Sequence, residues 1–150
     1  MTIDLTQVKS EMNGAAIEKQ AIILSIKPEY VEMILRGSKK FEYRKRLAKE
    51  NISVIFIYST FPCMRIVASV QVVGQLAAPP DELWKKTKEA AGISRENYLA
   101  YFHGCKTAYA YELGDVEVFE SEKELSDFGV GTAPQSFVYI PKPNPNLSQQ

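Results

Sequence analysis

The sequence predicts an α+β fold: a small β-barrel of five to six strands with about three helices at its rim. Three observations support this prediction. Short segments rich in branched and aromatic residues indicate strands, and helical segments fall between them without regular alternation. The 150 residues suffice for one domain with a buried core. The irregular order argues against a doubly wound parallel sheet, and no internal repeat is visible.

The N-terminal third contains the clearest pair of predicted elements. The apolar run Ala21 to Ile26 indicates a buried strand, and Pro28 is placed to begin a helix over Glu29 to Arg36. Gly37 stands where a left-handed C-terminal cap is favoured, so this helix is expected to end there. The polar residues 1–20 are expected to form an N-terminal arm, to which we assign no function.

The rest of the chain contains further predicted strands and helices. Strands are expected over Ile52 to Tyr58, Met64 to Val73, Thr107 to Leu113, Val116 to Phe119 and Ser136 to Ile140. Helices are expected over Asp81 to Ala90 and, capped by Ser94, over Arg95 to His103. Gly114 and Asp115 are interpreted as a break between two strands. The proline-rich residues 141–150 are expected to form a disordered tail, so the domain is predicted to cover residues 21–140.

Composition excludes several classes of protein. Eighteen basic and eighteen acidic residues balance, so any nucleic-acid site must be a local patch. Two cysteines and one histidine are too few for a four-ligand zinc site or a disulfide framework, and no metal or other cofactor is expected. The sequence shows no membrane-spanning run and no signal peptide, so a cytoplasmic location without membrane partners is expected. It carries no signal of oligomeric state.

One short motif suggests a binding or catalytic site. It reads Gly-x-Lys-x-x-Glu-x-Arg and comprises Gly37, Lys39, Glu42 and Arg44, just past the predicted helix end. In an extended strand Glu42 and Arg44 share one face, whereas Lys39 has the opposite parity and must reach in from the turn. Two cations and a carboxylate in this arrangement can hold a phosphate while the carboxylate contacts or activates a neighbouring group.

Two structural alternatives compete with this interpretation. Residues 39–50 could form a solvated amphipathic helix in which Glu42 and Arg46 are an ordinary ion pair. Alternatively, the strand is correct, but Glu42 and Arg44 form a surface pair with little effect beyond local structure. Gly37 and Ser38, just before this segment, and the two aromatic residues within it argue against the helix.

Basic and aromatic residues near the motif add to the case for a nucleic-acid site. Six of the eighteen basic residues fall within eleven positions: Lys39, Lys40, Arg44, Lys45, Arg46 and Lys49. Such local charge is typical of phosphate contacts, although a solvated face would show it too. Tyr58 and Phe61, at a predicted strand end, are candidates for stacking on a base, and core packing is the alternative.

The motif and its flanking segments resemble the ASCH domain, a family of the PUA-like superfamily. The resemblance begins with Ile23 to Pro28 and continues through the motif and the strand Val54 to Thr60. Further similar stretches are Val67 to Val73, Pro80 to Trp84, Gly92 to Glu96, Tyr101 to Gly104, Ala108 to Ala110 and Pro134 to Phe137. It covers about residues 21–140 and is of the stand-alone prokaryotic type.

The resemblance implies a compact β-barrel with a cleft that binds RNA or a nucleotide-like small molecule. Lys39, Glu42 and Arg44 would line this cleft, and Gly37 would let the chain turn into it. The remaining ligand-binding residues that the resemblance suggests are Lys27, Gln135 and Ser136. A binding module for RNA or a modified nucleotide, with a regulatory role, is the leading hypothesis.

The resemblance also suggests an enzyme as an alternative. Some small ASCH proteins are amidohydrolases of N4-acetylcytidine, and others are reported as ribonucleases. The amidohydrolases have a nucleophilic threonine where this chain has Glu42, so their mechanism does not transfer unchanged. Glu42 would instead be a general base and Lys39 an electrostatic stabiliser, with Glu89 and Glu96 as candidates for a further catalytic glutamate. A protein-interaction or regulatory domain is a further alternative.

Overall fold

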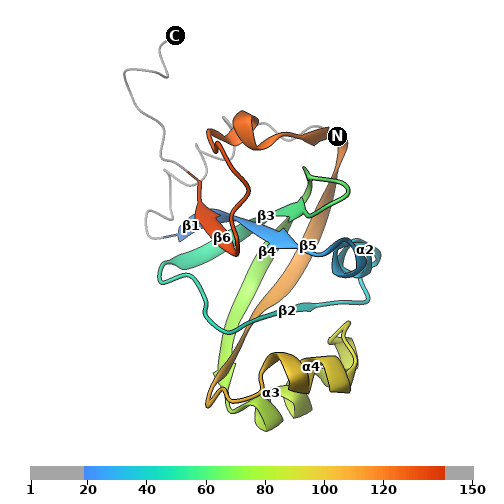
Figure 1. Ribbon diagram of the computed structural model, residues 1–150, viewed down its shortest axis with the longest axis vertical. Helices are drawn as coiled ribbons and strands as arrows, with labels where there is room; N and C mark the ends of the chain where they lie inside the picture. The colour runs from blue at the N-terminus through green and yellow to red at the C-terminus, as the bar shows by residue number, and fades with distance from the viewer. Residues whose placement is uncertain (1–18, 141–150) are drawn as a thin grey trace.

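The computed structural model describes residues 19–140, which form one curled β-sheet flanked by helices (Figure 1). The elements are β1 (Lys19–Ile26), α2 (Pro28–Arg36), β2 (Phe41–Arg44), β3 (Asn51–Ser59), β4 (Arg65–Ala78), α3 (Pro80–Thr87), the 3₁₀-helix η1 (Lys88–Ala90), α4 (Arg95–Tyr101), β5 (Ala108–Lys123), the 3₁₀-helix η2 (Leu125–Phe128) and β6 (Phe137–Tyr139). Residues 19 and 20 of the predicted arm begin β1. The rest of that arm and the predicted tail, 141–150, lie outside the described residues.

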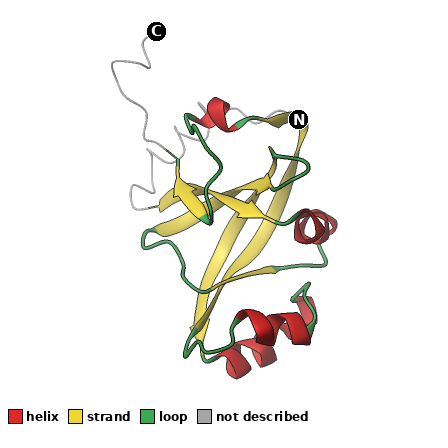
Figure 2. Ribbon diagram, in the orientation of Figure 1, coloured by secondary structure: helices red, strands yellow, loops and turns green. Residues whose placement is uncertain are grey.

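The strand order is β2-β5-β4-β3-β1-β6. Strands β1 and β3 pair in parallel, because α2 and β2 return the chain to the same end of the sheet, and all other neighbours are antiparallel. The sheet curls into a half-barrel, with α3 and α4 at one end and α2 at its side (Figure 2). Six strands and three α-helices within residues 19–140 confirm the predicted α+β fold class. None of these helices is long and apolar enough to cross a lipid bilayer.

Strand β1 is a continuous apolar run because both of its faces are buried. Ile22 and Leu24 belong to a core cluster that includes Ile34 of α2, whereas Ala21 and Ile23 face a second cluster on the other side of the sheet. Such two-sided burial explains why β1 lacks the alternating pattern of a half-exposed strand.

The interpretation of Gly114 and Asp115 as a break between two strands is wrong. Strand β5 runs without interruption from Ala108 to Lys123, and the two residues lie in a bulge, since Val116 pairs with Val70 but Leu113 pairs with Val72. A Cβ atom at Gly114 would lie 2.7 Å from the Cγ1 atom of Val73. Gly114 therefore lies close to the Val73 side chain of β4 within a continuous strand, and not in a turn.

A buried aromatic cluster holds the helical insertion against β2. Tyr98 of α4 packs edge to face against Tyr43 of β2, with ring centroids 5.0 Å apart, and its hydroxyl donates to the Pro80 carbonyl at 2.7 Å. Ser94 caps α4 as predicted, because its hydroxyl oxygen accepts from the Asn97 amide at 3.1 Å. These contacts place α4 beside the motif.

Candidate functional site

A cavity of about 750 Å³ opens between α2, β2 and α4. All three charged residues of the motif, Lys39, Glu42 and Arg44, contribute to its walls. Its lining also includes Ser25, Lys27, Tyr30, Thr60, Tyr101 and Gln135. The motif thus brings its charges to one concave site, which is where ligand-binding sites usually lie.

The turn into the motif begins at Gly37. This residue has φ +83°, and its amide donates to the Ile34 carbonyl at 3.0 Å, so it ends α2 in the predicted left-handed conformation. The Lys39 amide then donates to the Met33 carbonyl at 3.2 Å. Lys39 therefore lies in the turn before β2, as strand parity predicts.

Glu42 and Arg44 form a largely buried ion pair. The Nε and Nη2 atoms of Arg44 donate to Glu42 Oε2 at 3.0 and 2.7 Å, and the Arg44 and Glu42 side chains are 15% and 7% exposed, respectively. The segment is a strand, and the pair is withdrawn from bulk solvent. Both structural alternatives, the amphipathic helix and the exposed surface pair, are therefore wrong.

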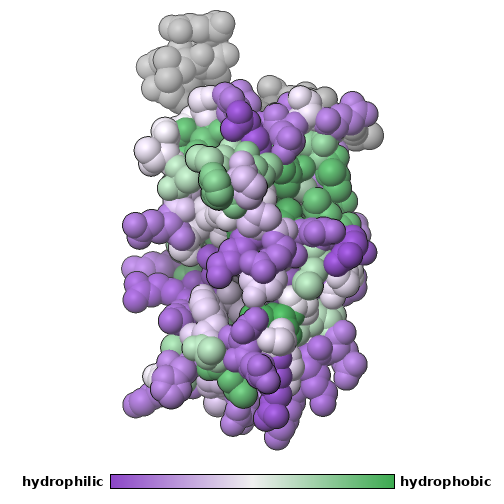
Figure 3. Space-filling view, turned by 45° about the vertical axis from the view of Figure 1, so that its right-hand side comes forward, coloured by the Kyte–Doolittle hydropathy of each residue, from purple (hydrophilic) through white to green (hydrophobic). Residues whose placement is uncertain are grey.

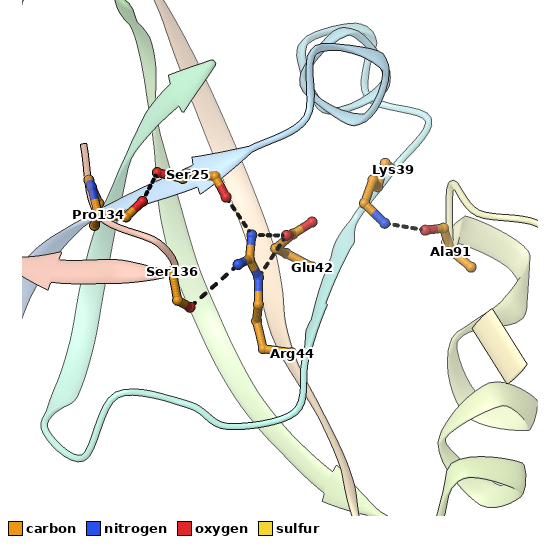
Figure 4. Close-up of polar contacts among 7 residues, drawn as sticks. All are labelled: Ser25, Lys39, Glu42, Arg44, Ala91, Pro134 and Ser136. Atoms are coloured by element: carbon orange, nitrogen blue, oxygen red, sulfur yellow. Dashed lines mark hydrogen bonds and ion pairs between the residues drawn. The ribbon is translucent and has the colours of Figure 1, made fainter. Parts of the chain in front are cut away.

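Arg44 also joins the two edges of the half-barrel (Figure 4). Its Nη2 atom donates to the Ser25 carbonyl of β1 at 2.7 Å, and Nη1 donates to the Ser136 hydroxyl at 3.5 Å. Ser25 in turn donates to the Pro134 carbonyl at 2.7 Å, which fastens the segment before β6. Each guanidinium nitrogen therefore has a protein acceptor, and Arg44 orients Glu42 within the cavity wall.

Lys39 is a buried ammonium, only 3% exposed. Its Nζ atom donates to the Ala91 carbonyl at 2.7 Å and lies 5.1 and 4.9 Å from the ring centroids of Tyr30 and Tyr43. These contacts stabilise the cation. Burial nevertheless lowers the pKa of Lys39 to about 8, an effect that nearby Glu42 opposes and nearby Arg44 adds to.

Gly92 shapes the site from the segment before α4. It has φ +63°, and a Cβ atom there would lie 2.5 Å from both Cβ and Cγ of Lys39. The backbone of this segment also supplies the Ala91 carbonyl to Lys39. The sequence shows Gly92 only as a separator of two helices, because its contact with Lys39 spans the fold.

We expect Gly92→Ala to lower the free energy of unfolding by about 2–3 kcal/mol, because a strained backbone conformation and a steric clash add together. Gly104→Ala is the matched control. Gly104 has φ +80°, but a methyl group added to it would meet no neighbouring atom within 4 Å, so only about 1 kcal/mol of backbone strain is expected. Urea denaturation of both variants measures the difference, and equal losses would contradict the packing of Gly92 against Lys39.

Of the remaining predicted site residues, some lie at the cavity and one is buried in the core. Lys27 and Gln135 line the cavity, and Ser136 reaches it through Arg44. Tyr58 is only 4% exposed and packs in the core cluster that contains Phe56, so its ring offers no face to a base. Sequence reasoning missed the cavity residues Tyr30 and Tyr101, which carry no motif of their own.

Glu89 and Glu96 are exposed and do not line the cavity, so they do not supply a further carboxylate to it. Within residues 19–140, no group of three or more histidine, cysteine, aspartate or glutamate side chains is arranged to hold a metal ion.

Residues 24–124 match the family model of the ASCH domain. The chain belongs to the ASCH domain family. This ASCH domain is 27% identical over 99 residues to an ASCH domain-containing ribonuclease of Zymomonas mobilis, covering 65% of the chain and 67% of that protein. It is also 26% identical over 134 residues to ATP synthase subunit alpha of Ureaplasma parvum, where the match covers 89% of the chain but spans only 17% of that protein.

Solved structures confirm the fold of the ASCH domain. The crystal structure of ASCH from Zymomonas mobilis superimposes with a TM-score of 0.74 at 24% identity, covering 87% of this chain and 92% of that one. A single-residue variant of the same protein gives a TM-score of 0.76 at 23% identity, covering 83% of this chain and 91% of that one.

Proposed function

We propose that this ASCH domain binds RNA or a nucleotide-like molecule in the cavity around Lys39. The observation that carries the proposal is the buried ammonium of Lys39 in the same cavity as the Glu42–Arg44 pair. Among the described residues, no carboxylate lies within ion-pair distance of Lys39. A buried cation without a paired anion favours the entry of one, and a phosphate group supplies it.

Glu42 gives the cavity a hydrogen-bond acceptor beside this cation. Arg44 engages only Oε2, and no donor of residues 19–140 is bonded to Oε1. Glu42 lies between Arg44 and Lys39 in Figure 4. In our proposal Oε1 accepts from an amino or imino group of a base, while Lys39 contacts a phosphate or carbonyl oxygen.

Basic residues outside the cavity add positive charge to the surface beside it. Lys40, Lys45, Arg46 and Lys49 are exposed on the segments that flank β2. Figure 3, in which the side of α2 is turned forward, shows hydrophilic residues across the middle of this face. These cations are placed to contact the phosphates of a longer chain. The name of the ribonuclease relative from Zymomonas mobilis favours RNA as that chain.

Salt dependence of binding tests this proposal. Affinity for a fluorescently labelled RNA of random sequence, followed by anisotropy, is expected to fall steeply as salt rises. For single-stranded RNA each phosphate contact contributes about 0.7 to the magnitude of the slope of log K against log salt. The double variant Lys45→Ala/Arg46→Ala removes two such contacts and is therefore expected to reduce that magnitude by about 1.4. The control is Lys85→Ala/Lys86→Ala on α3. It also removes two positive charges, but at residues that do not line the cavity. A flat salt response, or equal slopes for both variants, would count against it.

A second candidate function is hydrolysis of RNA or of an acylated nucleoside, with Lys39 and Glu42 as the catalytic residues. The lowered pKa of Lys39, about 8, favours it, because about a tenth of the amine is then neutral at pH 7 and can accept a proton. End-labelled RNA and N-acylated nucleosides are the substrates to screen. The turnover rate should rise towards pH 8, and turnover should disappear in Lys39→Met. If the protein binds RNA but cleaves none of these substrates, the hydrolase is rejected and the binding function remains.

A further inference from the structure

We infer that the ring of Tyr101 on α4 is a stacking position for a second nucleobase, in the α4 wall of the cavity around Lys39. The inference rests on the proposed function and deepens it. It defines the ligand class as a single-stranded RNA segment of at least two nucleotides, because only an unpaired base can stack on a side chain. One nucleotide would lie against Lys39, and its neighbour would stack on Tyr101 at the α4 wall of the same cavity.

The ring of Tyr101 is both accessible and fixed in orientation. Tyr101 lines the cavity and remains 37% exposed. Its ring meets that of Phe102 edge to face, with centroids 4.8 Å apart and planes at 71°. Phe102 is itself buried in the aromatic core that holds α4 in place. A ring held in this way loses little conformational entropy when a base stacks on it.

Neighbouring residues on α4 complete a site of the right shape and chemistry. Asn97, Ala100 and Tyr101 all line the cavity, and their spacing of three and four residues puts them on one face of the helix. Ala100 is small and leaves room beside the ring. Asn97 is exposed, and its side-chain carboxamide can donate and accept hydrogen bonds at the edge of a stacked base.

A cation is already associated with the ring. The Nζ atom of Lys45 lies 5.1 Å from the centroid of Tyr101. Lys45 is exposed, so its ammonium can leave the ring for a phosphate oxygen with little loss of energy. Lys39 precedes β2 and Lys45 follows it, so the two cations flank this strand. An RNA segment along β2 would therefore meet one cation near each end of this strand.

Removal of the aromatic ring tests the inference. The probes are a fluorescein-labelled hexaribonucleotide of random sequence and the same backbone with every base removed. Tyr101→Ala is expected to weaken binding of the hexaribonucleotide about fivefold to a hundredfold, the usual range for one stacked base, and to leave binding of the abasic backbone unchanged. Tyr101→Phe keeps the ring and is expected to bind as the wild type does.

Leu99→Ala is the matched control, because Leu99 lies on the same helix and is 38% exposed but does not line the cavity. Thermal melts confirm that each variant is folded. The stacking position would be overturned if Tyr101→Ala binds the hexaribonucleotide as the wild type does. It would also be overturned if this variant loses affinity equally for the hexaribonucleotide and for the abasic backbone. If the Tyr101 variants give one of these results but Lys39→Met weakens hexaribonucleotide binding, the stacking position is rejected and the proposed function is retained. If the wild type binds neither probe, both the proposed function and the stacking position are overturned.

Discussion

Lys39→Met is expected to raise the free energy of unfolding by about 1–2 kcal/mol and to abolish ligand binding. Burial lowers the pKa of Lys39 from 10.5 to about 8, so its charge destabilises the fold by about 3 kcal/mol at neutral pH. The lost hydrogen bond to Ala91 and the lost ring contacts offset about half of that gain. Methionine fills a similar volume without a charge. Urea denaturation and RNA binding measure the two effects.

The stability difference between Lys39→Met and the wild type is expected to depend on pH. Between about pH 8 and 10.5 the unfolded chain retains the Lys39 proton while the folded chain has lost it, so wild-type stability rises with pH in this window. Methionine does not titrate. The excess stability of the variant should therefore be constant below pH 8 and shrink above it. A difference that stays constant up to pH 10.5 would contradict the buried charge.

Glu42→Ala is expected to lower the free energy of unfolding by about 3 kcal/mol, because it leaves the largely buried Arg44 without its charge partner. It should also weaken ligand binding, since the free Oε1 acceptor is lost. The double variant Glu42→Ala/Arg44→Met removes both charges and is expected to be more stable than Glu42→Ala alone. Urea denaturation of the set measures the coupling between the two residues.

The control for the Glu42 variant is Glu32→Ala. Glu32 pairs with Arg36 four residues on, at 3.9 Å, but both side chains are more than half exposed. Its loss is expected to change stability by less than about 0.5 kcal/mol. Comparable losses for Glu32→Ala and Glu42→Ala would show that burial of the Glu42–Arg44 pair has no energetic consequence.

The arrangement of the motif could be predicted from the sequence because it depends on local geometry. Strand parity alone places Glu42 and Arg44 on one face and brings Lys39 in from the turn, and the glycine cap predicts where the turn begins. The fold class followed in the same way from short-range patterns of apolar residues and from helix caps.

The features that the sequence did not reveal depend on contacts between distant segments. Lys39 and Ala91 are 52 positions apart, and nothing near either residue announces their hydrogen bond. Tyr58 lies in a strand that is buried on both faces, so alternation does not say which side chains reach the cavity. Gly114 shows the same limit, since a glycine in a turn and a glycine in a tight bulge look alike in sequence.

Photocrosslinking is the most direct test of the central claim that the cavity around Lys39 binds RNA. RNA containing 4-thiouridine would be irradiated with the protein, and the crosslinked peptides identified by mass spectrometry. The predicted crosslinks fall at the cavity walls, in residues 27–30, 39–44 and 93–101 and at Gln135, and disappear in Lys39→Met. Crosslinks that instead cluster around the exposed Val73 and Val118 of the sheet, or that persist unchanged in Lys39→Met, would contradict it.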